Sequence, residues 1–450
     1  MNFKIYNIWN NSANRTKLVV KNAILSICLK FVSIVVSFLI VPLTIKYVDA
    51  TQYGIWMTIS SIVAWTNFFD LGLANGFKNR FAEAIAHDDI ELARDYVSTT
   101  YILISLIMFV VLSFILIIND FIDWSNLINV SSSYRKTLHN VFAILSVFFC
   151  MNMIANIFAK LLEGDQRPAL ASLINGIGQL FSLIVIFILV NVSHGDLTKL
   201  ALYFSGIPFA TMAIASIIMF YFTRYRIYRP SLKRWRPSLI KNIMGLGVKF
   251  FAIYLCLIAV FQLMNIVLSR EVGSLAVTEY NVANRYFNVA YMFIMILINP
   301  MWIAFTDAYH KNDFAWMKNM VSKFEKILLI CILGICVMAI ISPAIYRLWV
   351  GNEVSVPFKL SLCTAVLICA QTAGGVFMSF INGIGTLRIQ FLIYLFFAFI
   401  SYPLMSLSCK YFGVIGITFI PTIVYICQAL AARIQIWKII NRTASGVWLK

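Results

Sequence analysis

The sequence has 450 residues, of which 61% are hydrophobic and 12% are charged, and its mean hydropathy is +0.86. A soluble protein usually has about a quarter of its residues charged, so this composition excludes a soluble globular protein. The formal net charge of +18 would suit a nucleic-acid-binding protein, but the way the charges are distributed argues for a membrane protein.

Apolar runs of about twenty residues recur along the chain, and each is long enough to cross ~30 Å of hydrocarbon as a helix. The predicted fold class is therefore an all-α polytopic membrane protein. We expect about twelve transmembrane helices, at 23–45, 52–74, 96–118, 138–162, 168–192, 198–222, 243–269, 277–303, 324–345, 358–381, 387–409 and 413–437.

Most Lys and Arg residues fall in segments that are cytoplasmic if the chain starts inside the cell. This asymmetry is the positive-inside pattern, and it predicts that both termini are cytoplasmic. The densest basic segment, "RYRIYRPSLKRWRPSLIK", lies in the middle of the chain at 224–241. Two interpretations stay open for it: a topology determinant beside anionic lipid headgroups, or a docking site for a cytosolic partner.

Cofactor chemistry is poorly supported by the sequence. The nine Cys lie mostly inside the spans without a C-x-x-C pair, and the four His are scattered. We therefore expect neither a disulfide nor a metal site. A phosphate-binding G-x-x-x-x-G-K-[ST] motif is absent, and the expected outer loops are too short for a catalytic domain, so the sequence favours a protein without cofactors or enzymatic activity.

The stretch "FFDLGLANGFKNRFAEA" follows the second apolar run. Phe77, Phe81 and Ala84 fall on one face of a helix, which predicts a short amphipathic helix lying on the inner leaflet. Asp88, with Glu91 three residues later, is typical of the N-cap of the helix that leads into the third span.

The basic segment divides the chain into a six-helix lobe at 1–222, a linker at 223–241 and a second six-helix lobe at 242–450. Three pairs of stretches recur in the same order about 220 residues apart. They are "KNAILSICLKF" (21–31) with "KNIMGLGVKFF" (241–251), "FAEAIAHDD" (81–89) with "FTDAYHKND" (305–313), and "LLEGDQRPAL" (161–170) with "FINGIGTLRI" (380–389). Such an internal duplication is common in transporters, whose substrate sites lie between the repeats.

Four ionisable residues fall inside predicted spans: Lys30, Asp70, Lys249 and Arg285. A charge in a span usually faces the bundle interior or a water-filled cavity. Lys30 and Asp70 are expected at similar depths in neighbouring helices, which favours a structural ion pair. Snorkelling of Lys30 toward the headgroups and direct ligand binding or ion coupling remain as alternatives.

Lys249 and Arg285 have no evident carboxylate near them, although Glu271 or Glu279 could reach Arg285. Buried cations without anions favour an anionic substrate, and the Arg fork suits phosphate. Snorkelling of Arg285 to the outer interface is the alternative. The candidate substrate-binding residues are therefore Lys249, Arg285 and Lys30.

The segment "VPLTIKYVDATQYGIWMTISSIVAWTNFFDLGLANGFKNRFAEA" (41–84) resembles the first-repeat pattern of the polysaccharide (O-antigen) flippase branch of the multidrug/oligosaccharidyl-lipid/polysaccharide exporter superfamily. The matching features are "YG" after the first loop and "DLGL" before a basic amphipathic segment. "VTEYNVANRYFNV" (277–289) resembles the second-repeat counterpart, with a Tyr and an Arg early in the eighth span.

The resemblance implies a MATE-like fold, with two lobes around a central cavity. It implies a flippase that carries a polyprenyl-diphosphate-linked oligosaccharide across the bacterial inner membrane for O-antigen, lipopolysaccharide or capsule synthesis. Its expected partners are this lipid-linked substrate, membrane lipids, and the polymerase and glycosyltransferases that act on the same polysaccharide, with no nucleic acid. The alternatives are an ion-coupled small-molecule exporter of the same fold and a membrane-embedded polymerase or glycosyltransferase.

Overall fold

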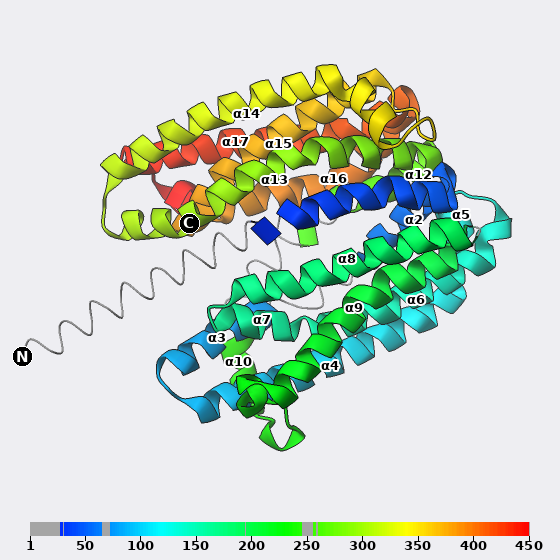
Figure 1. Ribbon diagram of the computed structural model, residues 1–450. Coiled ribbons are helices and arrows are strands. Elements are labelled where there is room, and N and C mark those ends of the chain that lie inside the picture. Colours follow the sequence, from blue (N-terminus) through cyan, green and yellow to red (C-terminus); the bar gives the residue numbers. More distant parts are fainter. Residues whose placement is uncertain are drawn as a thin grey trace, which may run out of the picture. The chain divides into compact units, whose positions relative to one another are not determined.

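The computed structural model of the chain describes residues 28–29, 31–64, 73–193, 195–244, 255–257 and 260–449. Every regular element in this part of the chain is a helix (Figure 1), as the composition predicted. Contacts in space divide the chain into two compact units. Unit 1 comprises Met1–Tyr47, Thr66–Ile122 and Lys136–Phe251, and unit 2 comprises Val48–Trp65, Asp123–Arg135 and Ala252–Lys450. The lobes at 1–222 and 242–450 follow the sequence repeat instead, and they stay a prediction.

Unit 1 is a bundle of long apolar helices joined by short polar turns. Its described helices are Phe31–Val48, α3 (Leu73–Ala86), α4 (Ile90–Phe121), α6 (Arg135–Ala155), α7 (Ile157–Gly164), α8 (Pro168–Val192), α9 (Leu197–Phe222) and α10 (Ile240–Met244), with 3-10 turns η3 (Arg224–Tyr228), η4 (Leu232–Arg234) and η5 (Pro237–Leu239). One predicted span, 138–162, is two helices, because α6 ends and α7 begins around Asn156.

The amphipathic helix predicted around residue 80 is α3, and its apolar face packs against other helices of unit 1. Phe77 and Phe81 are fully buried, in a core shared with side chains of α4 and α7. A Cβ added to Gly76 would lie 2.0 Å from the Ile243 carbonyl oxygen of α10, so only glycine allows these two backbones to approach so closely. The helical period identified the apolar face, but it could not distinguish a protein neighbour from lipid.

The helix that follows begins one residue later than predicted. The N-cap of α4 is Asp89, whose Oδ1 accepts a hydrogen bond from the Leu92 backbone N–H at 2.9 Å. Asp88 instead adopts a positive φ of 56° in the turn before the cap. Adjacent aspartates both suit an N-cap, so sequence alone could not decide between them.

Unit 2 contains the helices of the second half of the sequence and two segments of the first half. Its described elements are α2 (Ala50–Val63), α5 (Trp124–Leu127), η2 (Ser132–Tyr134), α12 (Leu263–Glu271), α13 (Ser274–His310), α14 (Phe314–Trp349), α15 (Phe358–Ile384), α16 (Arg388–Phe412), η6 (Gly413–Thr418), α17 (Phe419–Ile440) and η7 (Gly446–Leu449). Helix α15 packs against α13, α14 and α17, and the rings of Phe305 and Phe380 stack with centroids 4.1 Å apart in this core.

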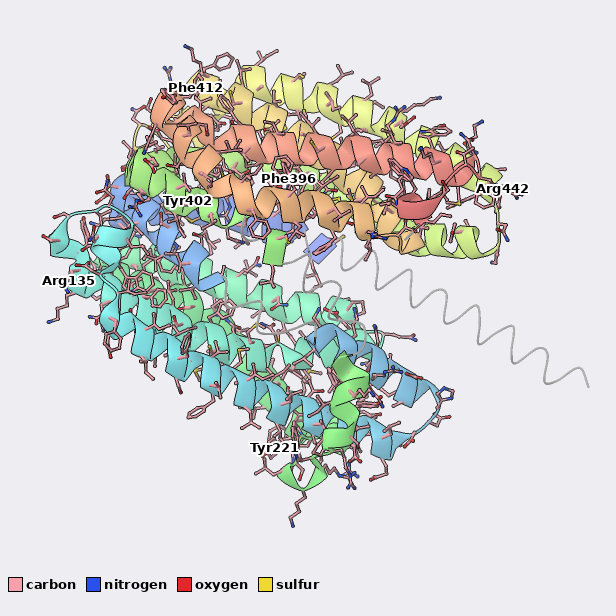
Figure 2. The ribbon with its side chains drawn as sticks, turned by 180° about the vertical axis from the view of Figure 1, so that it is seen from behind. Arg135, Tyr221, Phe396, Tyr402, Phe412 and Arg442 are labelled. Carbon is pink, nitrogen blue, oxygen red and sulfur yellow. The ribbon has the colours of Figure 1, made fainter. Side chains whose placement is uncertain are left out.

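Large apolar side chains cover the outside of both units. Phe109 on α4 is 70% exposed and Ile340 on α14 is 72% exposed, and Phe396 and Tyr402 project from α16 (Figure 2). Exposed apolar surface of this extent is what a lipid-facing helix presents. Eight segments of the described residues are long and apolar enough to cross a membrane, and the last of them, Arg388–Ile440, contains both α16 and α17. The chain is a multi-pass membrane protein.

Candidate functional site

Helix α13 carries a row of polar side chains on one face. Four of them follow one another at intervals of three, four and three residues: Thr278, Asn281, Arg285 and Asn288. Residues three and four apart lie on the same side of an α-helix, so this spacing produces a continuous polar stripe in a helix that is predicted to span the membrane. A polar stripe inside a membrane protein requires partners on the neighbouring helices.

Those partners come from α2 and α12. The Thr278 hydroxyl donates a hydrogen bond to the Ala50 carbonyl at the start of α2, with an O···O distance of 2.5 Å. Asn281 Nδ2 donates to Asn265 Oδ1 on α12 at 3.0 Å, and Asn265 Nδ2 lies 3.5 Å from the Met57 carbonyl of α2. The amide side chains therefore link three helices of unit 2.

Gly54 brings α2 close enough for these contacts. A Cβ at this position would lie 1.7 Å from the Ser274 carbonyl oxygen, at the first residue of α13. No side chain fits in that space, so the backbones of α2 and α13 touch only because residue 54 is glycine. The "YG" pair of the first repeat thus marks the point where the two helices meet.

Tyr53, the residue before this glycine, is only 4% exposed, and the positive charge of Arg285 acts on its hydroxyl. Arg285 itself is half-buried. These two residues, with Asn265 and the other three residues of the α13 stripe, form what we call the polar seam.

The polar seam contains a permanent cation, Arg285. Arg has five N–H donors and a fixed positive charge. Placing an Arg inside a spanning helix costs about 2.5–3.5 kcal/mol on insertion scales, which an anionic partner would offset. Further along the stripe, Asn288 Oδ1 is buried and accepts no hydrogen bond from the described part of the chain.

The two acids considered as partners of Arg285 have other environments. The Glu271 carboxylate accepts a hydrogen bond from the Ser406 hydroxyl at 2.5 Å and lies 3.9 Å from Lys410 Nζ, both on α16. Glu279 is half-buried on α13 and has no ion pair or hydrogen bond with the described residues. Neither acid therefore forms an ion pair with Arg285 in the described part of the chain.

The other predicted site residues lie outside the described residues. These are Lys30, Asp70 and Lys249. The Lys30–Asp70 ion pair and the contribution of Lys249 to substrate binding stay predictions. In the described part of the chain, no group of three or more His, Cys, Asp or Glu side chains could hold a metal ion.

The basic linker is paired with carboxylates of unit 1. Arg234 Nη1 lies 2.6 Å from Glu91 Oε2 and 3.2 Å from Asp95 Oδ1, both on α4. Arg236 Nε lies 3.4 Å from Asp95 Oδ2. These contacts hold η4 and η5 against α4, so part of the linker charge is already compensated within the protein.

A second anchor ties the start of the linker to the end of α7. The Asp165 carboxylate pairs with Arg224 and accepts a hydrogen bond from the Tyr225 hydroxyl at 2.6 Å. Tyr225 is 1% exposed, and this burial, together with the hydrogen bond to Asp165, raises its pKa to about 12. The hydroxyl therefore stays protonated and donates to Asp165 at any physiological pH.

Comparison with known proteins places the chain in a family. A family model described as "Polysaccharide biosynthesis protein" matches residues 19–304, which is more than half of the sequence. The chain belongs to the polysaccharide biosynthesis protein family. The match covers both stretches on which the sequence resemblance was based, 41–84 and 277–289, and confirms it. No curated protein is significantly similar to this family member in sequence.

Solved structures establish the fold of this family member. An inward-facing multidrug resistance MATE family transporter of the MOP superfamily matches with a TM-score of 0.74 and 15% identity, over 94% of this chain and 100% of that one. The outward-facing structure of such a transporter matches with a TM-score of 0.63 and 16% identity, over 95% of this chain and 97% of that one. The Vibrio cholerae MATE transporter VcmN in its bent form matches with a TM-score of 0.60 and 12% identity, over 96% of this chain and 100% of that one. The predicted MATE-like fold is therefore confirmed.

Sequence analysis identified Arg285 but did not predict that α2, with Tyr53, packs beside its helix. Tyr53 was noted as part of a family pattern, and nothing in the sequence indicates that it packs against a helix more than two hundred residues away. Asn281 and Asn288 were detectable, because "TEYNVANRYFN" contains a polar residue at each helical repeat around Arg285. The signal was the period of the polar residues, which is as informative in a membrane helix as the apolar period.

Proposed function

We propose that this polysaccharide biosynthesis protein is a flippase that moves a polyprenyl-diphosphate-linked oligosaccharide from the cytoplasmic to the outer leaflet. The observation that carries the proposal is Arg285, a half-buried guanidinium on the polar stripe of a helix that is predicted to span the membrane. A diphosphate presents oxygens to which an Arg fork can donate parallel, charge-assisted hydrogen bonds. The family and the transporter fold support a substrate of this kind.

The site in this proposal consists of Arg285 and the polar seam, with Lys249 and Lys30 as additional cations. The guanidinium binds the diphosphate, and amides such as Asn288, whose Oδ1 is unpaired in the described structure, hydrogen-bond to sugar or phosphate groups. Transport proceeds by alternating access and is driven by an ion gradient. The protein works in the bacterial inner membrane with both termini cytoplasmic, beside the polymerase and glycosyltransferases for O-antigen or capsule.

The test is lipid flipping in proteoliposomes that contain a fluorescent polyprenyl-diphosphate oligosaccharide, with chemical quenching of the outer leaflet as the readout. We expect Arg285→Ala to lower the flipping rate at least tenfold and Arg285→Lys to restore part of it, because Lys keeps the charge but loses the fork. The matched control is Arg226→Ala, which removes an exposed linker arginine. Wild-type flipping rates in Arg285→Ala would overturn the site.

A second candidate function follows from the structural neighbours, which are multidrug resistance transporters. An exporter of cationic small molecules would have to bind them near Arg285, where like charges repel. Uptake of a cationic dye into the same proteoliposomes separates the two functions. Dye transport without lipid flipping would favour the exporter.

A further inference from the structure

Helix α17 ends beside a groove of about 290 Å³ that is separate from the polar seam. On the predicted topology this end of the helix faces the cytoplasm, at the level of the lipid headgroups. Arg442, which follows directly after the groove, marks its place in Figure 2. Two basic side chains line the groove, together with an aromatic, an apolar and two polar side chains: Arg433, Lys438, Trp437, Ile434, Asn441 and Thr443. This composition suits a ligand with an anionic group.

The two basic side chains of the groove share one carboxylate. Arg433 Nε donates a hydrogen bond to Glu325 Oε1 on α14 at 2.8 Å, and its two Nη groups donate none to the described residues. Lys438 Nζ lies 4.6 Å from the centre of the Trp448 ring and pairs with no carboxylate in the described part of the chain. A ring holds an ammonium in place without neutralising its charge. The groove therefore has a net positive charge.

The C-terminal turn holds the groove in its shape. Gln435 is 1% exposed, and its Nε2 donates a hydrogen bond to the Trp448 carbonyl at 3.0 Å, which fixes the turn that places the ring over Lys438. The Lys438 carbonyl accepts hydrogen bonds from the backbone N–H groups of Thr443 at 2.8 Å and Ala444 at 3.1 Å. Free carbonyls at the end of a helix would repel an anion, because they carry partial negative charge. Capping weakens this repulsion at the groove.

An exposed apolar stripe on α17 leads to the groove. Ile423, Ile426, Leu430 and Ile434 are 46%, 42%, 56% and 48% exposed. They follow one another at intervals of three or four residues, so they lie along one face of the helix, and Trp437 continues this face into the groove. A soluble anion would contact the cations and leave the stripe unused. A phospholipid has a phosphate for the cations and acyl chains for the stripe, so the stripe favours a lipid as the ligand.

We propose that the groove at the end of α17 binds the phosphate of an anionic phospholipid of the inner leaflet, with an acyl chain along the apolar stripe. The cytoplasmic leaflet attracts basic groups through its anionic lipids, which fits a net positive groove at this level. The site is distinct from the polar seam, and the inference does not depend on the proposed function. It also differs from the basic linker, where Arg234 and Arg236 already pair with carboxylates of α4.

The experiment measures lipid binding to the full chain in detergent by native mass spectrometry, with phosphatidylglycerol and phosphatidylcholine of equal chain length as probes. We expect the wild type to bind phosphatidylglycerol about fivefold more tightly, because a Lys or Arg near an anionic surface contributes about one such factor. The double variant Arg433→Gln/Lys438→Gln should lose this preference. The matched control is Lys323→Gln/Lys326→Gln, which removes two exposed lysines of α14 that do not line the groove and should keep the preference.

A photoactivatable phosphatidylglycerol then locates the bound lipid. We expect crosslinks in the wild type within residues 423–441, and several-fold fewer in the double variant. Crosslinks confined to other helices would overturn the proposal, as would equal binding of the two lipids or an unchanged preference in the double variant. Competition by inorganic phosphate at the same concentration as the lipid would identify a site for a free anion and overturn the lipid assignment. Tighter capture of a short-chain prenyl diphosphate in the groove would overturn it in favour of a substrate site. If the double variant fails to fold, the lipid preference and the crosslinks of the wild type decide the question.

Discussion

Asp89 and Asp313 start α4 and α14 with the same turn. Each carboxylate accepts a hydrogen bond from the backbone N–H three residues further on, at 2.9 Å in the first case and 3.0 Å in the second. Each follows a residue in the left-handed region, Asp88 with φ 56° and Asn312 with φ 58°. The two turns lie in the stretches "FAEAIAHDD" and "FTDAYHKND", so the sequence repeat corresponds to a repeated local structure.

We predict that Asp313→Ala destabilises the protein by about 1 kcal/mol, because the first N–H groups of α14 lose their side-chain acceptor. Asp313→Asn should cost less, since it keeps an acceptor oxygen and loses only the interaction of the charge with the helix dipole. Thermal unfolding in detergent measures both. An Asn variant as unstable as the Ala variant would show that charge, rather than capping, is what matters at this position.

A methyl group at residue 54 should separate α2 from α13. In Gly54→Ala the new Cβ would meet the Ser274 carbonyl at 1.7 Å, so the helices must move apart and the contacts of the polar seam lengthen. We expect a loss of transport of at least tenfold, measured by lipid flipping. Gly334→Ala on α14 is the control, because a Cβ there has no atom within 4 Å and should stabilise the helix by up to about 1 kcal/mol. Equal transport in the two variants would contradict the close approach.

Removing the Asp95 carboxylate should release the basic linker from α4. Arg234 and Arg236 would lose this shared partner, and a surface pair of this kind contributes only about 0.2–1 kcal/mol, so overall stability should change little even though Asp95 is partly buried. Local mobility should change more. We expect Asp95→Ala to speed tryptic cleavage after Lys233 several-fold in limited proteolysis. The Asp120→Ala variant, which loses a carboxylate that is 72% exposed, should be cleaved by trypsin at the wild-type rate.

Tyr225 should make stability fall at high pH. Its pKa is raised by burial to about 12 in the folded protein, whereas an unfolded tyrosine ionises near 10. Below pH 10 both states are protonated and the stabilisation is complete. Between about 10 and 12 the unfolded state loses its proton first, so stability falls with a limiting slope of about 1.4 kcal/mol per pH unit. Chemical unfolding from pH 9 to 12 should show a shallower decline in Tyr225→Phe, and parallel curves would contradict this assignment.

The class of fold was predictable from the sequence because hydropathy reports burial in lipid directly. The repeat was also predictable, since capping turns need particular residues at fixed positions, as at Asp89 and Asp313. The surroundings of α3 could not be predicted from the sequence. Phe77 and Phe81 have the same period whether their face meets lipid or protein, and only the three-dimensional contacts distinguish the two.

Only part of the candidate site could be predicted from the sequence. An Arg inside a span is conspicuous in any sequence, so Arg285 could be identified from its position alone. The close approach of α2 to α13 at Gly54 and Ser274 could not be identified in the same way. A contact between residues so distant in sequence leaves no trace in local composition.

The aspartates that begin helices also divide between the two sides of the membrane. On the predicted topology, Asp49, Asp123 and Asp196, which cap α2, α5 and α9, face the exterior, whereas Asp89 and Asp313 face the cytoplasm. Removing one of these carboxylates would therefore weaken a helix start on one face of the membrane and leave the capped starts on the other face intact.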